Sequence, residues 1–135
     1  MAHFLIVSSR YYAPIAAELE AGAQAVMRAE GASFEVVEAL GALEISPIIR
    51  FALQAKKYDG FVALGCIIRG ETTHYETVCE ESARGLTWLA MEHQACIGNG
   101  ILTLESEDQA DARGDKGAFA ARAALQLVRM KEKFT

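Results

Sequence analysis

A histidine directly follows a glycine-containing turn near the middle of this sequence. The turn spans residues 70–73 and leads into a helical pattern. Backbone N–H groups at the start of a helix bind anions such as phosphate without needing a lysine. His74 lies in the first turn of that helix, and imidazole titrates near neutral pH. These residues predict an anion site beside a proton-transfer group. The alternative to the anion site is that Thr72 or Thr73 merely caps the helix, and the alternative for His74 is a structural role.

The residues around this turn exclude two kinds of nucleotide site. Gly65 and Gly70 have the spacing of a P-loop, but Glu71 stands where that motif needs a lysine. A carboxylate in that place would repel the phosphates. No GxGxxG motif follows the first predicted strand, and a dinucleotide site would require one. Neither a nucleoside triphosphate nor a dinucleotide is therefore the expected ligand.

Polar and aromatic residues also follow the other predicted strands. Residues 9–12, which include two tyrosines, follow the first strand, and residues 41–44 follow the second. Ligands of open α/β sheets bind outside the carboxyl ends of the strands. We therefore expect a tyrosine ring, the Glu44 carboxylate and the His74 imidazole to converge on one crevice.

A basic pair lies in the break between the last two predicted helices. Arg113 and Lys116 are separated only by Gly114 and Asp115, and two cations at this spacing can clamp a phosphate. The alternative is a solvated turn that caps the preceding helix. The spacing alone leaves both interpretations open.

The elements that must position these residues alternate along the chain. Short β-branched runs alternate with longer helical patterns, which is typical of a parallel sheet flanked by helices. The most apolar run, at residues 60–68, predicts a central strand, whereas two glycines are expected to weaken the last one. The predicted strands are 3–8, 34–37, 60–68 and 96–104, and the predicted helices are 14–30, 44–57, 73–91, 106–113 and one from 116 onward.

Length and composition predict one soluble α/β domain over residues 1–135. The chain is 52% hydrophobic and 23% charged, and its net charge of −5 argues against binding to nucleic acid or anionic lipid. No apolar stretch approaches the roughly 20 residues that span a bilayer, and no basic signal start is present, so we expect a cytoplasmic protein. Three separated cysteines predict reduced, buried thiols, and three scattered histidines predict no metal site.

Three motifs together give the sequence a likeness to a known family. The motifs are Ser9-Arg10-Tyr11, Gly41-Ala42-Leu43-Glu44-Ile45 and Gly65-Cys66-Ile67-Ile68-Arg69-Gly70-Glu71-Thr72-Thr73-His74-Tyr75. In this order they resemble the 6,7-dimethyl-8-ribityllumazine synthases, and the third block is highly specific. The likeness runs from about Phe4 to the C-terminal helix.

The resemblance implies a flavodoxin-like three-layer α/β/α sandwich with a four-stranded parallel sheet. It also implies a transferase of riboflavin biosynthesis, which condenses 5-amino-6-(D-ribitylamino)uracil with 3,4-dihydroxy-2-butanone 4-phosphate and needs no cofactor or metal. Family members assemble through pentamers, with each active site built between two subunits. A pentamer is expected here rather than a sixty-subunit shell, because the chain begins at the family's second strand.

The resemblance also assigns roles to individual residues. The catalytic residues it implies are His74, which shuttles protons, and Arg113 and Lys116, which the neighbouring subunit brings to the site. The substrate-binding residues it implies are Tyr11, Gly41, Ala42, Leu43, Glu44, Cys66, Ile67, Ile68, Glu71, Thr72, Asn99 and Arg113. Among them, Tyr11 stacks on the pyrimidine and Ala42 and Glu44 bind the ribityl chain. Ile67 and Ile68 bind the ring through the backbone, and Glu71 and Thr72 bind the phosphate through backbone N–H groups.

Two departures from the family pattern bear on these roles. Asn99 occupies a position that is often aromatic, which favours a hydrogen bond over apolar cover of the pyrimidine. The loop before Lys116 is shortened to Gly114 and Asp115. The alternative function is a flavin-binding or storage relative with little catalytic activity, and a third hypothesis is an unrelated flavodoxin-like signalling or electron-transfer domain.

Overall fold

A parallel sheet with helices on both faces makes up the protein. The computed structural model describes residues 2–70, 74–113 and 115–135, with the side chains of residues 111–113 left out. The strands are β1 (His3–Ser9), β2 (Ser33–Ala39), β3 (Gly60–Ile68) and β4 (Ile97–Leu104). The helices are α1 (Ala13–Ala29), α2 (Ile45–Gln54), α3 (His74–Glu92) and α4 (Lys116–Lys133), with the 3-10 helices η1 (Ala42–Glu44) and η2 (Glu107–Arg113).

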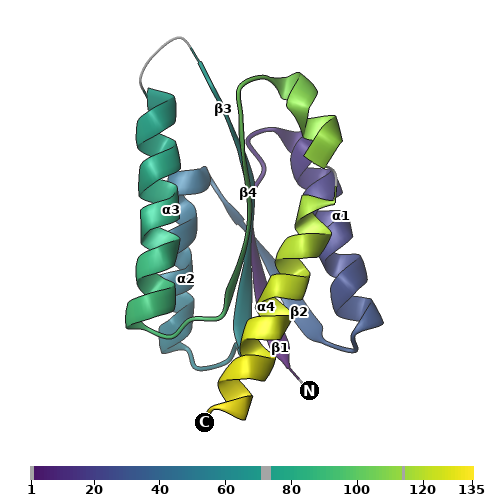
Figure 1. Ribbon diagram of the computed structural model, residues 1–135, viewed down its shortest axis with the longest axis vertical. Helices are drawn as coiled ribbons and strands as arrows, with labels where there is room; N and C mark the ends of the chain where they lie inside the picture. Colours follow the sequence, from purple (N-terminus) through teal and green to yellow (C-terminus); the bar gives the residue numbers. More distant parts are fainter. Residues whose placement is uncertain (1, 71–73, 114) are drawn as a thin grey trace.

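The four strands are all parallel and lie in the order β2-β1-β3-β4. Helices α1 and α4 cover one face of the sheet and α2 and α3 cover the other, which gives the predicted three-layer α/β/α arrangement (Figure 1). β3 is an inner strand and is buried along nearly its whole length, as its apolar sequence predicts. Among the described residues, no helix is both long and apolar enough to cross a membrane.

Side chains that alternate along β1 divide the core into two halves. Phe4 and Ile6 pack against α1 and α4, whereas Leu5 and Val7 pack against the side of the sheet that α2 and α3 cover. Both halves consist of fully buried aliphatic and aromatic side chains, whose burial is the main favourable term for folding. This alternation therefore determines which face of the sheet each residue at the end of β1 points to.

The helix predicted from about residue 44 to 57 begins within one residue of its expected start but ends three residues early. The 3-10 helix η1 precedes it, and α2 begins at Ile45. The α-helix ends at Gln54 because Lys56 adopts a positive φ of 53°, which interrupts the helical hydrogen bonds. The segment predicted as a short helix at 106–113 is the 3-10 helix η2.

The glycines of β4 have a packing role that the sequence prediction missed. A Cβ added at Gly98 would lie 1.8 Å from the backbone oxygen of Ala120 in α4, and one at Gly100 would lie 2.7 Å from Leu64. Because a backbone atom cannot move aside as a side chain can, α4 packs against the sheet only where residue 98 has no side chain. These glycines permit close packing of a helix and do not merely weaken a strand.

We predict that Gly98→Ala lowers the free energy of unfolding by about 3 kcal/mol, because the added methyl group must displace α4. The measurement is the denaturant midpoint at fixed protein concentration. Thr103→Ala, at an exposed position of the same strand, is the control and should change the midpoint little. A Gly98→Ala midpoint equal to that of the control would contradict the close packing.

Candidate active site

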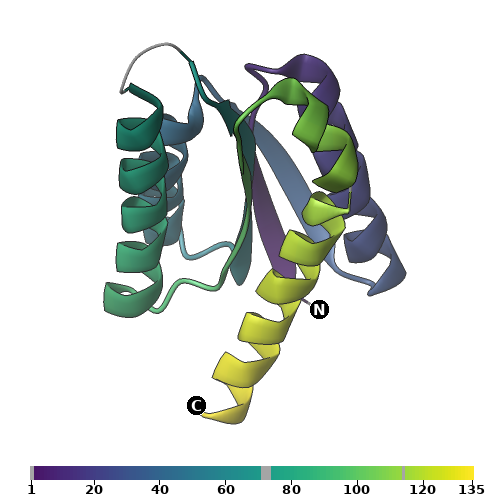
Figure 2. The same ribbon diagram turned by 45° about the horizontal axis from the view of Figure 1, so that its top comes forward.

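A pocket of about 330 Å³ opens at the carboxyl ends of β1 and β3. Figure 2 shows this edge of the sheet, where the β1–α1 connection and η2 lie on one side and the starts of α2 and α3 lie on the other. The residues that line the pocket are Ser9, Tyr11, Tyr12, Gly41, Ala42, Leu43, Glu44, Cys66, Ile67, Ile68, Gly70, His74, Tyr75 and Val78.

Nine of the predicted site residues line this pocket. They are Tyr11, Gly41, Ala42, Leu43, Glu44, Cys66, Ile67, Ile68 and His74. The crevice expected between an aromatic ring, a carboxylate and a histidine is therefore present within one subunit.

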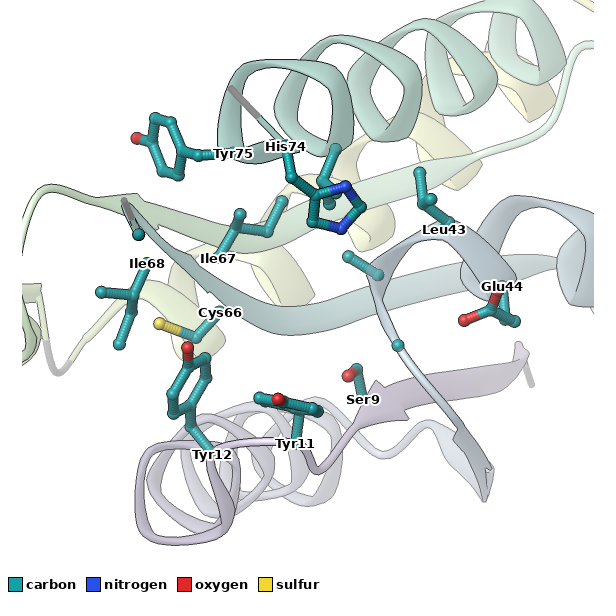
Figure 3. Close-up of a pocket in the computed structure, with 14 residues that line it drawn as sticks. Ser9, Tyr11, Tyr12, Leu43, Glu44, Cys66, Ile67, Ile68, His74 and Tyr75 are labelled. Atoms are coloured by element: carbon teal, nitrogen blue, oxygen red, sulfur yellow. The ribbon is translucent and has the colours of Figure 1, made fainter. Parts of the chain in front are cut away.

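His74 and Tyr11 approach the pocket from opposite sides. The His74 side chain extends from the first turn of α3, and the Tyr11 ring lies across the pocket at the β1–α1 connection (Figure 3). Tyr11 is 75% exposed, which leaves an aromatic face open for stacking. The Tyr12 ring packs edge-on against it, with the two centroids 5.0 Å apart. One face of the Tyr11 ring is therefore open toward the pocket that His74 also lines.

A partly buried ion pair holds the loop that carries Tyr11. Arg10 donates from Nε to Glu20 Oε2 at 2.8 Å and from Nη2 to Glu20 Oε1 at 2.9 Å. The Ser8 hydroxyl donates to the same Oε2 at 2.7 Å. The hydrogen bond from Arg10 lowers the pKa of the Glu20 carboxyl below its ordinary value. Arg10 thus fastens the loop to α1 and is itself directed away from ligand binding.

A second arginine, Arg69, links three segments of the chain next to the pocket. Arg69 Nη1 donates to Glu76 Oε1 and its Nε donates to Glu105 Oε2, both at 2.5 Å. Its guanidinium carbon lies 4.5 Å from the centre of the Tyr75 ring. These contacts with Glu105 and Glu76 raise the pKa of Arg69 and lower that of Glu76. Arg69 therefore links the end of β3 to the first turn of α3 and to the segment that leads into η2.

Two ionisable groups of the pocket lining, the Cys66 thiol and the Tyr12 phenol, have raised pKa values. Burial raises the pKa of the Cys66 thiol to about 11, and burial also raises the pKa of the Tyr12 phenol. A protonated thiol is a poor nucleophile and a poor metal ligand. Cys66 and Cys96 are buried and free, as predicted, while Cys79 is half-buried. Cys66 therefore contributes shape and apolar surface to the pocket.

Several predicted site residues do not line this pocket. Asn99 is exposed on β4, where its Oδ1 accepts a hydrogen bond from the Ile101 N–H at 3.0 Å. Lys116 begins α4, with Nζ 5.5 Å from the centre of the Phe119 ring. Of the remaining predictions, Glu71, Thr72 and the side chain of Arg113 lie outside the described residues. Across the described part of the chain, no cluster of three or more His, Cys, Asp or Glu residues is arranged to hold a metal ion.

Sequence reasoning did not assign a site role to five of the lining residues. They are Ser9, Tyr12, Gly70, Tyr75 and Val78. Tyr12, Gly70 and Tyr75 are each next to a predicted site residue, and Ser9 is two residues before Tyr11. Val78 lies one helical turn after His74. The helical spacing of four was the available signal for Val78, whereas no spacing shows which of two adjacent loop side chains faces a ligand.

Comparison with known proteins gives a consistent result over the length of the chain. The family model described as 6,7-dimethyl-8-ribityllumazine synthase matches residues 1–132. A relative of that name from Bartonella bacilliformis is 49% identical over 98% of this chain and 91% of its own. One from Beijerinckia indica is 51% identical over 98% and 77%, and one from Novosphingobium aromaticivorans is 49% identical over the full length of both chains.

We predict that Glu20→Gln makes stability less dependent on pH. The folded pKa of Glu20 lies below the ordinary 4.5, so its ion pair stabilises the fold above that pH and is lost as the pH falls through the folded pKa. The variant should be less stable by about 1–3 kcal/mol at neutral pH and should lose less stability between about pH 6 and pH 3. Denaturant midpoints across this range provide the measurement.

The control for this prediction is Glu81→Gln. Glu81 pairs with Arg84 on the exposed surface of α3, and exposed pairs contribute little to stability. An equal response of the two variants to pH would show that the Glu20 pair is not an important anchor.

Proposed function

The chain belongs to the 6,7-dimethyl-8-ribityllumazine synthase family, and we propose that the pocket at the carboxyl ends of β1 and β3 is its substrate site. The enzyme is a transferase of riboflavin biosynthesis. It condenses 5-amino-6-(D-ribitylamino)uracil with 3,4-dihydroxy-2-butanone 4-phosphate. The observation that supports this placement most is that Tyr11, Glu44 and His74, from three separate segments, line one pocket.

The pyrimidine is placed on the open face of Tyr11. Stacking on an aromatic ring suits a planar heterocycle, and the adjacent backbone of Ile67 and Ile68 offers hydrogen-bonding groups at the end of β3. The ribityl chain then runs toward Ala42 and Glu44, where a carboxylate can accept hydrogen bonds from its hydroxyl groups. One substrate thereby spans the pocket from β3 to η1.

The phosphate of the second substrate is placed at the start of α3. The α3 dipole points its positive end at this edge of the sheet, and its first backbone N–H groups lack helical partners. Arg10 and Arg69 are each paired with carboxylates, so neither is available as the main phosphate ligand. The backbone of Glu71 and Thr72 together with Arg113 therefore takes this role in the proposal.

The reaction requires little from the protein beyond placement and proton transfer. The 5-amino group of the pyrimidine attacks the ketone and forms an imine with loss of water, and phosphate is then eliminated. The ribitylamino nitrogen attacks the remaining carbonyl and closes the second ring with loss of a second water. Amines and ketones condense spontaneously, so holding the two substrates together supplies much of the rate enhancement. His74 faces the pocket above Tyr11, where it moves protons between the reacting nitrogen and oxygen atoms.

We further propose that a neighbouring subunit completes the site in a homopentamer. Neither Asn99 nor Lys116 lines the pocket of its own chain. The family resemblance implies that the neighbouring subunit brings Lys116 to the site and covers the pyrimidine at the position of Asn99. Large apolar side chains on α2 and α3 are exposed in the single chain: Phe51 is 69% exposed, Trp88 51% and Met91 76%. Exposed apolar surface of this kind favours burial against another subunit. The single domain of residues 1–135 then functions as part of a cytoplasmic pentamer.

We predict that His74→Ala lowers kcat for lumazine formation by about 100-fold, the lower end of what a general acid–base group contributes. The measurement is the rate from the two purified substrates, corrected for the spontaneous reaction. His93→Ala is the control, because His93 packs on Trp88, and neither of these residues lines the pocket. A wild-type rate no higher than the spontaneous rate, together with tight riboflavin binding, would favour a storage protein.

We predict a particle of five times the 14.6 kDa chain mass in sedimentation or light scattering.

Refolding a mixture of His74→Ala and Arg113→Ala chains should restore about a quarter of the wild-type activity, because that fraction of sites unites an intact histidine with a neighbour's intact arginine. Either variant alone serves as the control. A monomer, or a mixture as inactive as its components, would contradict the shared site.

A further inference from the structure

Ser9 is a buried polar residue that faces the pocket. It is the last residue of β1, is 4% exposed and contributes to the pocket lining. Leu5 and Val7 point to the side of the sheet that α2 and α3 cover, and alternation places Ser9 on that same side. Ser8 points to the opposite side, where its hydroxyl donates to Glu20. The two adjacent serines therefore have different environments.

The Ser9 hydroxyl has no hydrogen-bond partner among residues 2–70, 74–110 and 115–135, which contrasts with the short bond made by Ser8. Ser9 is 4% exposed as a residue, but its oxygen is not among the fully buried unpaired atoms of the described residues. The oxygen therefore keeps contact with the pocket, where a ligand hydroxyl can take the place of water. Gly65 of β3 lies beside Ser9, because a Cβ added at Gly65 would come within 3.4 Å of the Ser9 Cβ. Residue 65 therefore has no side chain that could cover the hydroxyl. The hydroxyl is thus buried yet accessible to a ligand.

The place of Ser9 along the pocket indicates which part of a ligand it meets. Ser9 pairs in register with Ala39 of β2, and the chain continues from there into Gly41 and η1. Figure 3 shows Ser9 between Tyr11 and the η1 segment that carries Glu44, while Tyr12 and Ile68 lie toward the other end. Ser9 is therefore close to the part of the pocket assigned to the ribityl chain.

We propose that the Ser9 hydroxyl binds a hydroxyl group of the ribityl chain and is a further specificity-determining residue of this site. A serine hydroxyl both donates and accepts hydrogen bonds, as does each hydroxyl of a polyol, so the two groups match without a charge. The ring is met by Tyr11, and the phosphate is placed at the start of α3, on the other side of the pocket from β1. The inference rests on the proposed substrate site.

The test compares Ser9→Ala with the wild-type enzyme. Loss of one neutral hydrogen bond should weaken binding of the ribitylaminopyrimidine by about 2- to 10-fold. The dissociation constant is measured by calorimetry with this substrate alone, and KM is measured for both substrates. We expect KM to rise for the pyrimidine, with kcat and the KM for dihydroxybutanone phosphate unchanged. Ser82→Ala is the matched control, because Ser82 is also 4% exposed but lies on α3 outside the pocket lining.

A pyrimidine analogue with an unhydroxylated alkyl chain separates hydrogen bonding from a general effect on the pocket. Wild type and Ser9→Ala should bind this analogue equally well. Equal affinity of the two proteins for the natural substrate, or an equal loss with the analogue, would overturn the role of Ser9. The proposed site has a separate test. If the wild-type enzyme forms lumazine but Tyr11→Ala binds the pyrimidine as tightly as wild type, the substrate site is placed wrongly, and the Ser9 proposal is then wrong as well.

Discussion

All described parts of the pocket depend on the parallel direction of the four strands. Because β1 and β3 are adjacent and run the same way, the residues that follow them emerge at the same edge of the sheet. β2 lies on the other side of β1, so the chain that leaves it as η1 reaches the same edge. Segments far apart in sequence thus bring Tyr11, Glu44 and His74 to one cavity.

Charged residues near the pocket mainly hold its walls in place. Arg10 is fastened to Glu20 behind the Tyr11 loop, and Arg69 joins the beginning of α3 to the end of β4 through Glu76 and Glu105. Both guanidinium groups are neutralised by carboxylates. The pocket itself presents aromatic and aliphatic side chains with few polar groups, a surface suited to a flat heterocycle with a polyol chain.

The contact between α4 and the sheet connects stability to the proposed partner site. Gly98 allows α4 to lie directly against β4, and α4 begins at Lys116, the residue placed in a neighbouring subunit's site. The position of that lysine is therefore determined by backbone packing several residues away. Asn99, next to Gly98, is exposed on the opposite face of the same strand. β4 thus carries Asn99 itself and, through Gly98, also positions the helix that begins at Lys116. Both residues belong to the proposed interface.

The sequence alone determined the order and type of the strands and helices and the central place of residues 60–68. Motifs shared with a known family also identified most pocket residues. Apolar periodicity and residues at strand ends are local signals, so they can be read along one chain. Only the tertiary structure decided that Arg10 turns away while Ser9 faces the pocket, and that Gly98 admits a helix. These outcomes depend on which segments pack together and on the direction of each side chain after packing, which local spacing does not specify.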